Sequence, residues 1–397
     1  MANKVDYKVM NHEVDVVVVG AGLVGLAAVI ALHAEGKRVA LVDSKENSIK
    51  RTKSWDTRIY ALTPATEDWL QHLAVWPLVK QCRVNDVERM SLWHPESEIP
   101  LDLLATDANL TKLACIIENK NLMQALWTKI KALEITVILG SACQCLEYNE
   151  NAVILHLENG NTVSAALLVA SDGANSFVRQ QLAIPTKAKS FDQVALVANY
   201  LTEKGHSNIA RQWFAPHSTL ALLPLPDQHV SMVWSLQTEL ARELLNIEEQ
   251  QLTERVQEHS RNALGELKAV SNTLSFDLHQ VTAKQLIGER VVLIGDAAHQ
   301  VHPMAGQGAN LGFRDVIALQ AIIANSHYLQ DIGEKTFLRQ YERARKLDVL
   351  NMNTLTSGLD GWFAKESPLV KKVTDWGMTQ LNKHASLKRI LIKQAVT

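Results

Sequence analysis

Residues 15–43 decide the fold: they read DVVVVGAGLVGLAAVIALHAEGKRVALVD. The β-branched run at 16–19 has no polar alternation, which predicts a strand covered on both faces. A helix is expected from about Leu23 to Glu35, where Gly36 ends it. The apolar run 38–42 then predicts a second strand. A strand, a crossover helix and a strand make a βαβ unit, so the two strands are expected to be parallel.

The turn between the first strand and the helix has the pattern G-x-G-x-x-G. Gly20 permits the tight turn, Gly22 lets the backbone approach a pyrophosphate, and Gly25 lets helix and strand pack closely. Asp43 follows 23 residues after Gly20, at the end of the second strand, where its carboxylate can accept hydrogen bonds from adenosine ribose hydroxyls. This context favours a dinucleotide site over a purely structural glycine turn.

The uncharged stretch 16–34 is also long enough to span a membrane, and Lys4 and Lys8 before it loosely imitate a signal peptide. Two acids, Glu13 and Asp15, adjoin its start, and the glycines divide it. We therefore interpret the stretch as a buried strand, a turn and a helix.

The composition is that of a globular protein with a sizeable core. Of 397 residues, 47% are hydrophobic, and 40 Lys plus Arg nearly balance 42 Asp plus Glu. A near-neutral chain gives no electrostatic reason to expect a nucleic-acid partner. The four cysteines are too few and too irregularly spaced for a disulfide framework or a metal site, and indicate free thiols in a reducing compartment: Cys82, Cys115, Cys143 and Cys145.

Patterns in the rest of the chain predict alternating helical and β-rich regions. The predicted helices are Thr66–Lys80, Asn121–Leu133, Ile247–Leu264 and the tail from Tyr341 onward. The predicted strands are a hairpin at 152–157 and 162–169, a β-rich region at 194–236, and Val291–Ile294. The simplest architecture is a nucleotide-binding domain made from separated segments and interrupted by a β-sheet domain.

A second glycine-rich segment directly follows the strand at 291–294. Asp296 stands at the strand end, where it could bind the hydroxyls of a polyol chain. A helix is expected from about Asn310, so the amides of Gly308, Ala309 and Asn310 would form a positive helix end suited to the anionic edge of a reduced flavin.

Three further segments carry polar residues but are not decisive by themselves. Residues 171–179 follow a strand and contain Asp172 and Gly173. Residues 56–62 contain Arg58, either a cofactor contact or a solvated charge. Residues 117–122 precede a helix that carries Gln124.

Taken together and in this order, the five segments resemble those of the FAD-dependent aromatic hydroxylases, with the closest similarity to the ubiquinone-biosynthesis hydroxylase group. The resemblance runs from Asp15 to about Arg345, and its most specific part is GDAAHQVHPMAGQGANLGFRD at 295–315. The segments 191–199, 222–225 and 233–235 point to the ubiquinone group.

The resemblance implies a role for each matching residue. The implied cofactor-binding residues are Gly20, Gly22, Gly25, Asp43, Arg58, Gln124, Asp172, Gly173, Asp296, Gly306, Gly308, Ala309 and Asn310. Pro303 would line the pocket at the flavin ring. His302 is the other candidate catalytic residue, although it and His299 are expected as packed or hydrogen-bonded side chains rather than proton shuttles. Two departures from the family pattern are Ser171, where Ala or Gly is usual, and Lys120, where Arg is frequent.

The implied fold is α/β: a Rossmann-like FAD-binding domain built from discontinuous segments, with an inserted β-sheet substrate domain and a helical C-terminus. The expected FAD-binding segments are 1–75, 101–183 and 279–345. The expected substrate-domain segments are 76–100 and 184–278, and the C-terminal helices occupy 346–397.

The implied activity is an FAD-dependent monooxygenation without a metal. NAD(P)H reduces FAD, O2 adds to give a C4a-hydroperoxide, and the distal oxygen is transferred to the aromatic ring of a polyprenylated ubiquinone precursor. The alternatives are a flavin hydroxylase of another small aromatic compound, and a non-catalytic flavin- or lipid-binding subunit of a biosynthetic complex. The sequence lacks the dedicated lysine and the tryptophan motif expected of an FAD-dependent halogenase. An NAD-dependent dehydrogenase would leave the glycine-rich segment 295–315 unexplained.

The expected location is cytoplasmic, with peripheral attachment at the inner face of the membrane as an open alternative. Between Trp362 and Lys393, apolar and basic residues are interleaved. This pattern favours a helix packed on its own domain with a basic solvated face over docking to a membrane or a biosynthetic complex.

Overall fold

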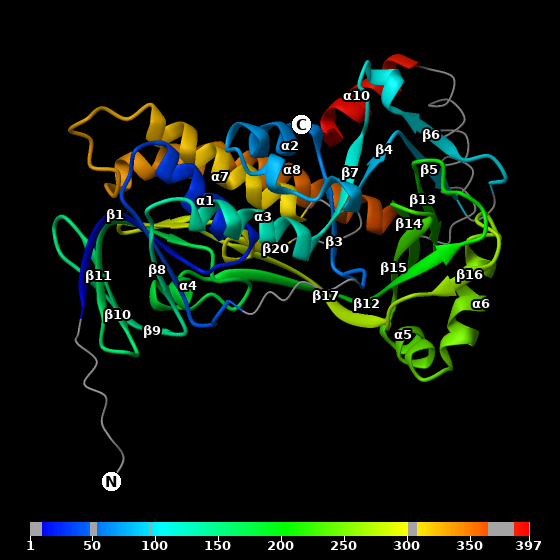
Figure 1. The fold of residues 1–397 in the computed structure, drawn as a ribbon, viewed down its shortest axis with the longest axis horizontal. Coiled ribbons are helices and arrows are strands. Elements are labelled where there is room, and N and C mark those ends of the chain that lie inside the picture. The colour runs from blue at the N-terminus through cyan, green and yellow to red at the C-terminus, as the bar shows by residue number, and fades with distance from the viewer. Residues whose placement is uncertain (1–9, 48–53, 95–96, 301–307, 364–384, 397) are drawn as a thin grey trace, which may run out of the picture.

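The computed structural model describes residues 10–47, 54–94, 97–300, 308–363 and 385–396. Two large sheets stand at opposite ends of an elongated molecule, and helices line one side of it (Figure 1). The α/β fold predicted from the sequence is confirmed.

The first sheet has eight strands drawn from separated parts of the chain, in the order β18-β19-β11-β1-β2-β8, with β9 and β10 attached through β11. Its strands are β1 (Asn11–Val19), β2 (Val39–Asp43), β8 (Thr136–Leu139), β9 (Cys143–Tyr148), β10 (Val153–Leu157), β11 (Thr162–Ala170), β18 (Ile287–Gly288) and β19 (Val291–Leu293). The pairs β1–β2, β1–β11, β2–β8 and β11–β19 are parallel. Parallel strands must be covered on both faces, which explains their unbroken apolar runs.

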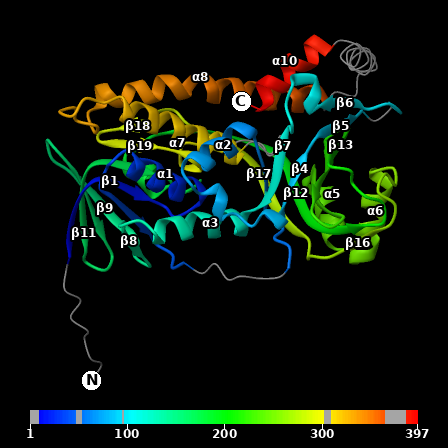
Figure 2. The ribbon, with the colours of Figure 1, turned by 45° about the horizontal axis from the view of Figure 1, so that its top comes forward.

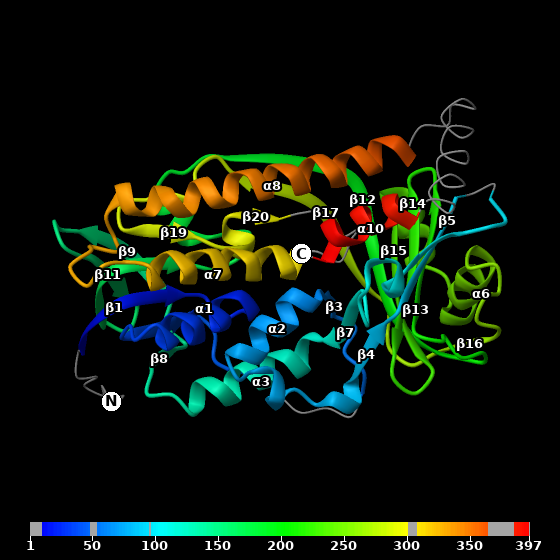
Figure 3. The same cartoon turned by 90° about the horizontal axis from the view of Figure 1, so that it is seen from above.

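Helices cover this sheet on the side seen in Figure 3, where α8, α7, α1 and α3 lie side by side. They are α1 (Leu23–Ala34), α3 (Asn119–Lys131), α7 (Gly308–Ala324) and α8 (Lys335–Phe363). The stretch 16–34 is therefore strand, turn and helix, as predicted. No helix in the described part of the chain is long and apolar enough to cross a membrane.

The second sheet has nine strands in the order β20-β17-β12-β15-β14-β13-β5-β6, with β16 attached to β12. They are β5 (Arg89–Trp93), β6 (Leu101–Leu104), β12 (Thr186–Thr202), β13 (Ile209–Ala215), β14 (Ser218–Leu225), β15 (His229–Gln237), β16 (Leu267–Ala269), β17 (Leu274–Ala283) and β20 (His299–Gln300). One face packs on α5 (Thr238–Leu245) and α6 (Glu249–His259) through a core that includes Tyr200, Trp213 and Trp234.

A small third sheet joins the two large ones. It consists of β3 (Ile59–Leu62), β7 (Ala114–Glu118) and β4 (Val84–Val87), and Figure 2 shows β4 and β7 between the large sheets. α2 (Pro64–His72) follows β3. The remaining short helices are η1 (Trp76–Leu78), η2 (Gln81–Arg83), η3 (Ala105–Ala108), α4 (Phe177–Gln181) and η4 (Gly295–Ala297).

Two predicted helices are too long. The helix predicted to reach Lys80 ends at His72, because Ala74 adopts a left-handed backbone (φ 53°) and Pro77 follows in a separate turn. The helix predicted for 247–264 covers only Glu249–His259, since Arg261 and Asn262 both have positive φ. In the tail, α8 begins at Lys335 and α10 covers Ala385–Val396; the stretch between them lies outside the described residues.

Two predicted domain boundaries fall inside elements, and a third separates two paired strands. The boundary at residue 100 separates β5 from its hairpin partner β6, the boundary at 278 cuts β17, and the boundary at 345 cuts α8. We propose moving them to 104, 283 and 334, so that β5 and β6 stay together and β17 and α8 are each left whole.

Candidate cofactor and substrate site

The three glycines of the β1–α1 turn differ in what surrounds them. Gly20 has a φ of 107°, and a Cβ there would collide with the Ser171 backbone. A Cβ on Gly25 would collide with the carbonyl of Gly20. A Cβ on Gly22 would meet nothing within 4 Å. Gly22 therefore borders open space at the N-terminus of α1, which has no side-chain cap and no acid in its first turn. Free amides and open space suit a pyrophosphate.

Ser171 ties the end of β11 to this turn. Its hydroxyl lies 2.9 Å from the carbonyl oxygens of both Val19 and Gly20, to which it can donate. The serine thus stabilises the turn. A single sequence gives no signal of this role.

Asp43 lies beside the glycine turn, as its position at the end of β2 predicts. Its carboxylate accepts hydrogen bonds from the Ala21 amide (2.6 Å) and the Lys45 amide (2.7 Å). Since an ionised carboxylate has about four acceptor sites, it retains capacity for ribose hydroxyls.

Asp172 and Gly173 follow β11, next to β1 in the sheet. One Asp172 oxygen accepts a hydrogen bond from the Val178 amide (3.1 Å), whereas the buried Oδ1 has no partner among the described residues. Gly173 has a φ of 87° and open space where a Cβ would stand. Buried polar atoms are normally hydrogen-bonded, so this strand end fits an absent polar partner.

Asp296 is an exposed residue of η4, which follows β19. Loss of hydration raises its pKa, and His299 and Arg58 oppose that shift. Burial also raises the pKa of the neighbouring Tyr60 to about 12. Arg58 and Tyr60, from one segment, therefore lie near Asp296, from a distant one.

A buried ionic network holds the Asp296 turn. The fully buried Asp315 on α7 accepts hydrogen bonds from the Gly295 amide (2.8 Å), His299 Nε2 (2.7 Å) and Arg345 Nε (2.6 Å). Burial acts to raise the pKa of Asp315, but these donors outweigh it and hold the pKa below its ordinary value. His299 is a packed, hydrogen-bonded residue, as expected. The role of Asp315 was not predicted, because only the folded chain brings its three partners together.

Near the start of the described part of α7, the side chain of Asn310 bonds to the protein itself, so it is not available to bind a cofactor. That side chain is buried: its Oδ1 accepts from the Thr63 amide (3.1 Å) and its Nδ2 donates to the Ala61 carbonyl (2.7 Å). The described part of α7 starts at Gly308, the first described residue after 301–307, so the helix end predicted at Gly308 to Asn310 stays a prediction. His302, Pro303 and Gly306 lie outside the described residues.

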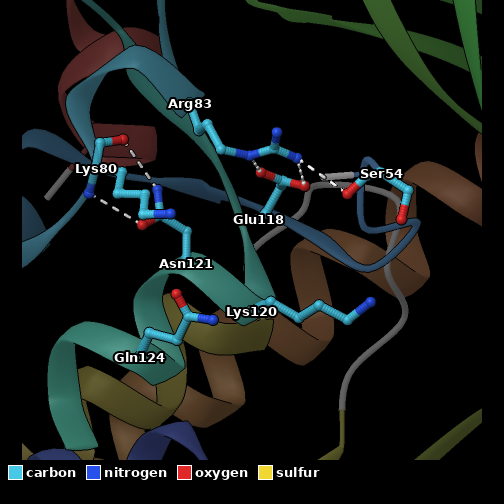
Figure 4. A pocket seen from close by; sticks show the side chains of 7 residues that line it. All are labelled: Ser54, Lys80, Arg83, Glu118, Lys120, Asn121 and Gln124. Carbon is cyan, nitrogen blue, oxygen red and sulfur yellow. Dashed lines mark hydrogen bonds and ion pairs between the residues drawn. The ribbon is translucent and has the colours of Figure 1, made fainter. Parts of the chain in front are cut away.

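Gln124 lies in a small recess beside α3, apart from the cleft that holds Arg58. Figure 4 shows Arg83 paired with Glu118, with Arg83 Nε 2.5 Å from Glu118 Oε2, while Lys120 extends from α3 away from that pair. Asp56 links the recess at Gln124 to the cleft at Arg58. Its carboxylate accepts hydrogen bonds from the amides of Arg58 (3.2 Å) and Lys120 (3.1 Å). Asp56 was also missed by the sequence reasoning.

An apolar cleft of about 270 Å³ lies against the nine-stranded sheet, on the face opposite α5 and α6. Arg58 and Ile59 form one wall, and the Arg58 guanidinium lies 5.9 Å from the centre of the Phe276 ring. The sheet contributes Ala195, Val197, Val233 and Phe276, and Gln300 of β20 also lines the cleft. A mostly apolar cleft with a few polar groups is typical of a small-molecule site.

Comparisons with known proteins agree with this geometry. Residues 13–353 match the family model described as FAD binding domain. The chain is 30% identical over 393 residues to 3-demethoxyubiquinol 3-hydroxylase of Escherichia coli (strain K12), covering 97% of this chain and 99% of that protein. It is 29% identical to ubiquinone hydroxylase UbiL of Rhodospirillum rubrum, covering 96% and 89%.

Among solved structures, p-nitrophenol 4-monooxygenase PnpA from Pseudomonas putida has a similar fold. The TM-score is 0.79 at 18% identity, covering 97% of this chain and 98% of that one. At this identity the likeness concerns the fold.

Proposed function

This chain belongs to the FAD-binding-domain family, as an FAD-dependent monooxygenase, and we propose that it hydroxylates the aromatic ring of a polyprenylated ubiquinone precursor. NAD(P)H is the electron donor and O2 the second substrate. The observation that carries the proposal is the apolar cleft beside Arg58 and β20, whose volume suits one substituted ring. The names and full-length similarity of the two hydroxylases support the choice of substrate.

The described residues fit FAD at the ends of four strands of the first sheet, β1, β2, β11 and β19. We propose that Gly20, Gly22 and Gly25 hold the pyrophosphate against α1, that Asp43 binds the ribose, and that Asp296 binds the ribityl chain. The open space at Gly22 and Gly173 and the unpartnered Asp172 Oδ1 support this assignment. The amides of Gly308, Ala309 and Asn310 would face the flavin edge, with Arg58 and Gln124 reaching the cofactor from the flanking segments.

The chemistry supplied by bound FAD is uptake of two electrons from NAD(P)H and activation of O2. The chain's own residues orient the ring and exclude water. Val197, Val233 and Phe276 provide apolar walls, which limit water access and the wasteful loss of activated oxygen. The Arg58 guanidinium at the cleft wall favours a phenol in its anionic form, which is more electron-rich.

A polyprenyl tail is insoluble in water, so we further propose that the protein collects its substrate at the inner face of the membrane or within a ubiquinone-biosynthesis complex. The alternative function is a non-catalytic subunit that retains flavin or lipid binding. Substrate-dependent NAD(P)H oxidation by the purified protein distinguishes the two.

The first experiment is the quinone profile of lipid extracts from a strain that lacks this protein. Accumulation of one under-hydroxylated polyprenyl phenol is expected, and its structure identifies the ring position. Re-expression of the wild type should restore the profile, whereas Asp296→Ala should not, because this variant loses FAD. A normal profile in the deletion strain would redirect the search to another aromatic substrate.

A further inference from the structure

Two large apolar side chains are exposed on β17, at the edge of the nine-stranded sheet. Leu274 is 44% exposed and Phe276 is 39% exposed. At these residues β17 pairs with β12 on one side, and no strand in the described part of the chain pairs with its other side. Edge strands usually carry charged residues, which prevent association with other chains. Adjacent exposed apolar residues on such a strand therefore indicate a surface that a ligand covers.

The strand register places both side chains on the same face of the sheet as the apolar cleft. Residues paired across strands share a face, and successive residues of one strand point to opposite faces. Leu274 is paired with Val197, which is paired in turn with Val233 on β15. Val197 and Val233 line the cleft, as does Phe276. Leu274 is therefore the exposed end of an apolar row that crosses three strands from the cleft to the sheet edge.

The core of the protein does not account for these two side chains. Ser275 lies between them on β17, and it is paired with Leu196, which belongs to the core beneath α5 and α6. The strand thus turns a polar residue towards the face with the core and its apolar residues towards the face with the cleft. Because an apolar side chain adds to folding stability only when it leaves water, this orientation favours a role in binding.

The size of the cleft leaves the tail of the proposed substrate outside it. The cleft has a volume of about 270 Å³, whereas sites that enclose a drug-sized ligand measure about 300–1,000 Å³. One substituted ring fits this volume, but a polyprenyl chain has to leave it. The row from Val233 through Val197 to Leu274 offers the chain a continuous apolar surface from the ring site to the sheet edge.

We propose that Leu274, together with the exposed part of Phe276, binds the isoprenoid tail of the substrate where it leaves the cleft, an inference that rests on the proposed function. The ring occupies the cleft, and the tail crosses the row to the edge of β17. Contact with the tail removes apolar surface from water on both partners and adds affinity in proportion to the area covered. Since the tail leaves in one direction, its attachment point on the ring faces Leu274, and this orients the ring in the cleft.

The test compares two ligands that differ only in the tail. A phenol with a methyl group in place of the tail, and the same phenol with a tail of three isoprene units, are titrated into the FAD-loaded protein, and binding is followed by the change in flavin absorbance. The wild type should bind the tailed phenol about tenfold more tightly, the factor expected when about 60 Å² of apolar surface leaves water. In Leu274→Ser this preference should fall toward one, with the affinity for the methylphenol unchanged.

Two control variants separate the loss of an apolar contact from other effects. Leu240→Ser changes a leucine of similar exposure, 41%, on α5 at the opposite face of the sheet, and it should keep the full preference. Leu274→Met retains an apolar side chain at the proposed site and should keep most of the preference. Melting temperature and FAD content should match the wild type in all three variants, because exposed positions contribute little to stability.

The outcomes separate this inference from the proposed function. If the wild type binds both phenols equally well, or if Leu274→Ser keeps the preference for the tail, the inference is wrong, while binding of the methylphenol still supports the proposed function. If neither phenol perturbs the flavin of the wild type, the proposed substrate class fails and the inference fails with it. Sedimentation of the free proteins tests a second copy as the occupant: a wild-type dimer that Leu274→Ser dissociates would overturn the inference.

Discussion

At the scale of single residues, the glycines of the β1–α1 turn have different roles, which substitutions can distinguish. Gly22→Val adds atoms where the protein has open space, at a backbone geometry (φ −74°, ψ 178°) that valine accepts. The variant should therefore fold normally and lose FAD. Gly25→Ala places a methyl group against the Gly20 carbonyl, so the fold itself should lose about 1–3 kcal/mol.

Thermal unfolding of both apoproteins and the FAD content after purification measure these two effects. A yellow Gly22→Val protein with full FAD occupancy would show that the pyrophosphate lies elsewhere.

Asp315 is expected to stabilise the fold and position Asp296. Asp315→Asn leaves Arg345 with less compensation in a buried site, so the protein should lose about 3 kcal/mol or more at neutral pH. FAD should also bind more weakly, because the Gly295–Asp296 turn loses its anchor. Denaturant unfolding of the apoprotein and FAD titration report the two effects separately.

The contribution of Asp315 to the free energy of unfolding should decrease as the pH falls. The pKa of Asp315 is lower in the folded chain than its ordinary value of 3.8, so its contribution is complete above pH 3.8 and is lost as the pH falls further. The wild type should therefore lose stability more steeply than Asp315→Asn on acidification below about pH 4. Parallel acid-unfolding curves would contradict this assignment.

At the scale of elements, α10 packs on its own protein in the described residues. Ile392 is buried with Ala210 and Leu225 of the nine-stranded sheet, and Lys388 Nζ lies 3.0 Å from Asp107 Oδ2. α10 also contacts η3. This supports the packed alternative for the end of the tail, with Lys388 paired rather than solvated.

The docking of α10 should depend on Ile392. Ile392→Ala should weaken it by about 2–4 kcal/mol, through lost burial and the cavity left behind. Hydrogen exchange of the α10 amides should accelerate accordingly. Ile390→Ala, at a side chain that is 56% exposed, is the matched control and should change little. Equal exchange in both variants would mean that Ile392 does not hold the helix.

At the scale of the whole molecule, the FAD site is assembled from strand ends that lie far apart in the chain. β1, β11 and β19 are neighbours in one sheet although more than a hundred residues separate each from the next. A ligand that binds all three should stabilise the folded state as a unit, by about 2.7 kcal/mol at a free FAD concentration of a hundred times Kd. The melting temperature of the apoprotein should therefore rise with added FAD, and that of Gly22→Val should not.

The sequence alone determined the elements whose signals are local. The β-branched run at 16–19, the three glycines and Asp43 lie within one βαβ unit, so spacing predicted both the parallel pair and the dinucleotide site. Helix ends were predicted less well, because a single left-handed residue such as Ala74 stops a helix without altering the apolar pattern.

Only the tertiary structure decided which distant residues meet. Asp315 has its partners at 295, 299 and 345, and Asp56 accepts a hydrogen bond from the amide of the distant Lys120. These contacts depend on strand order and register across the two large sheets. The physical reason is that periodicity along the chain records which face a residue takes, whereas its neighbours on that face are set by the pairing of segments far apart in sequence.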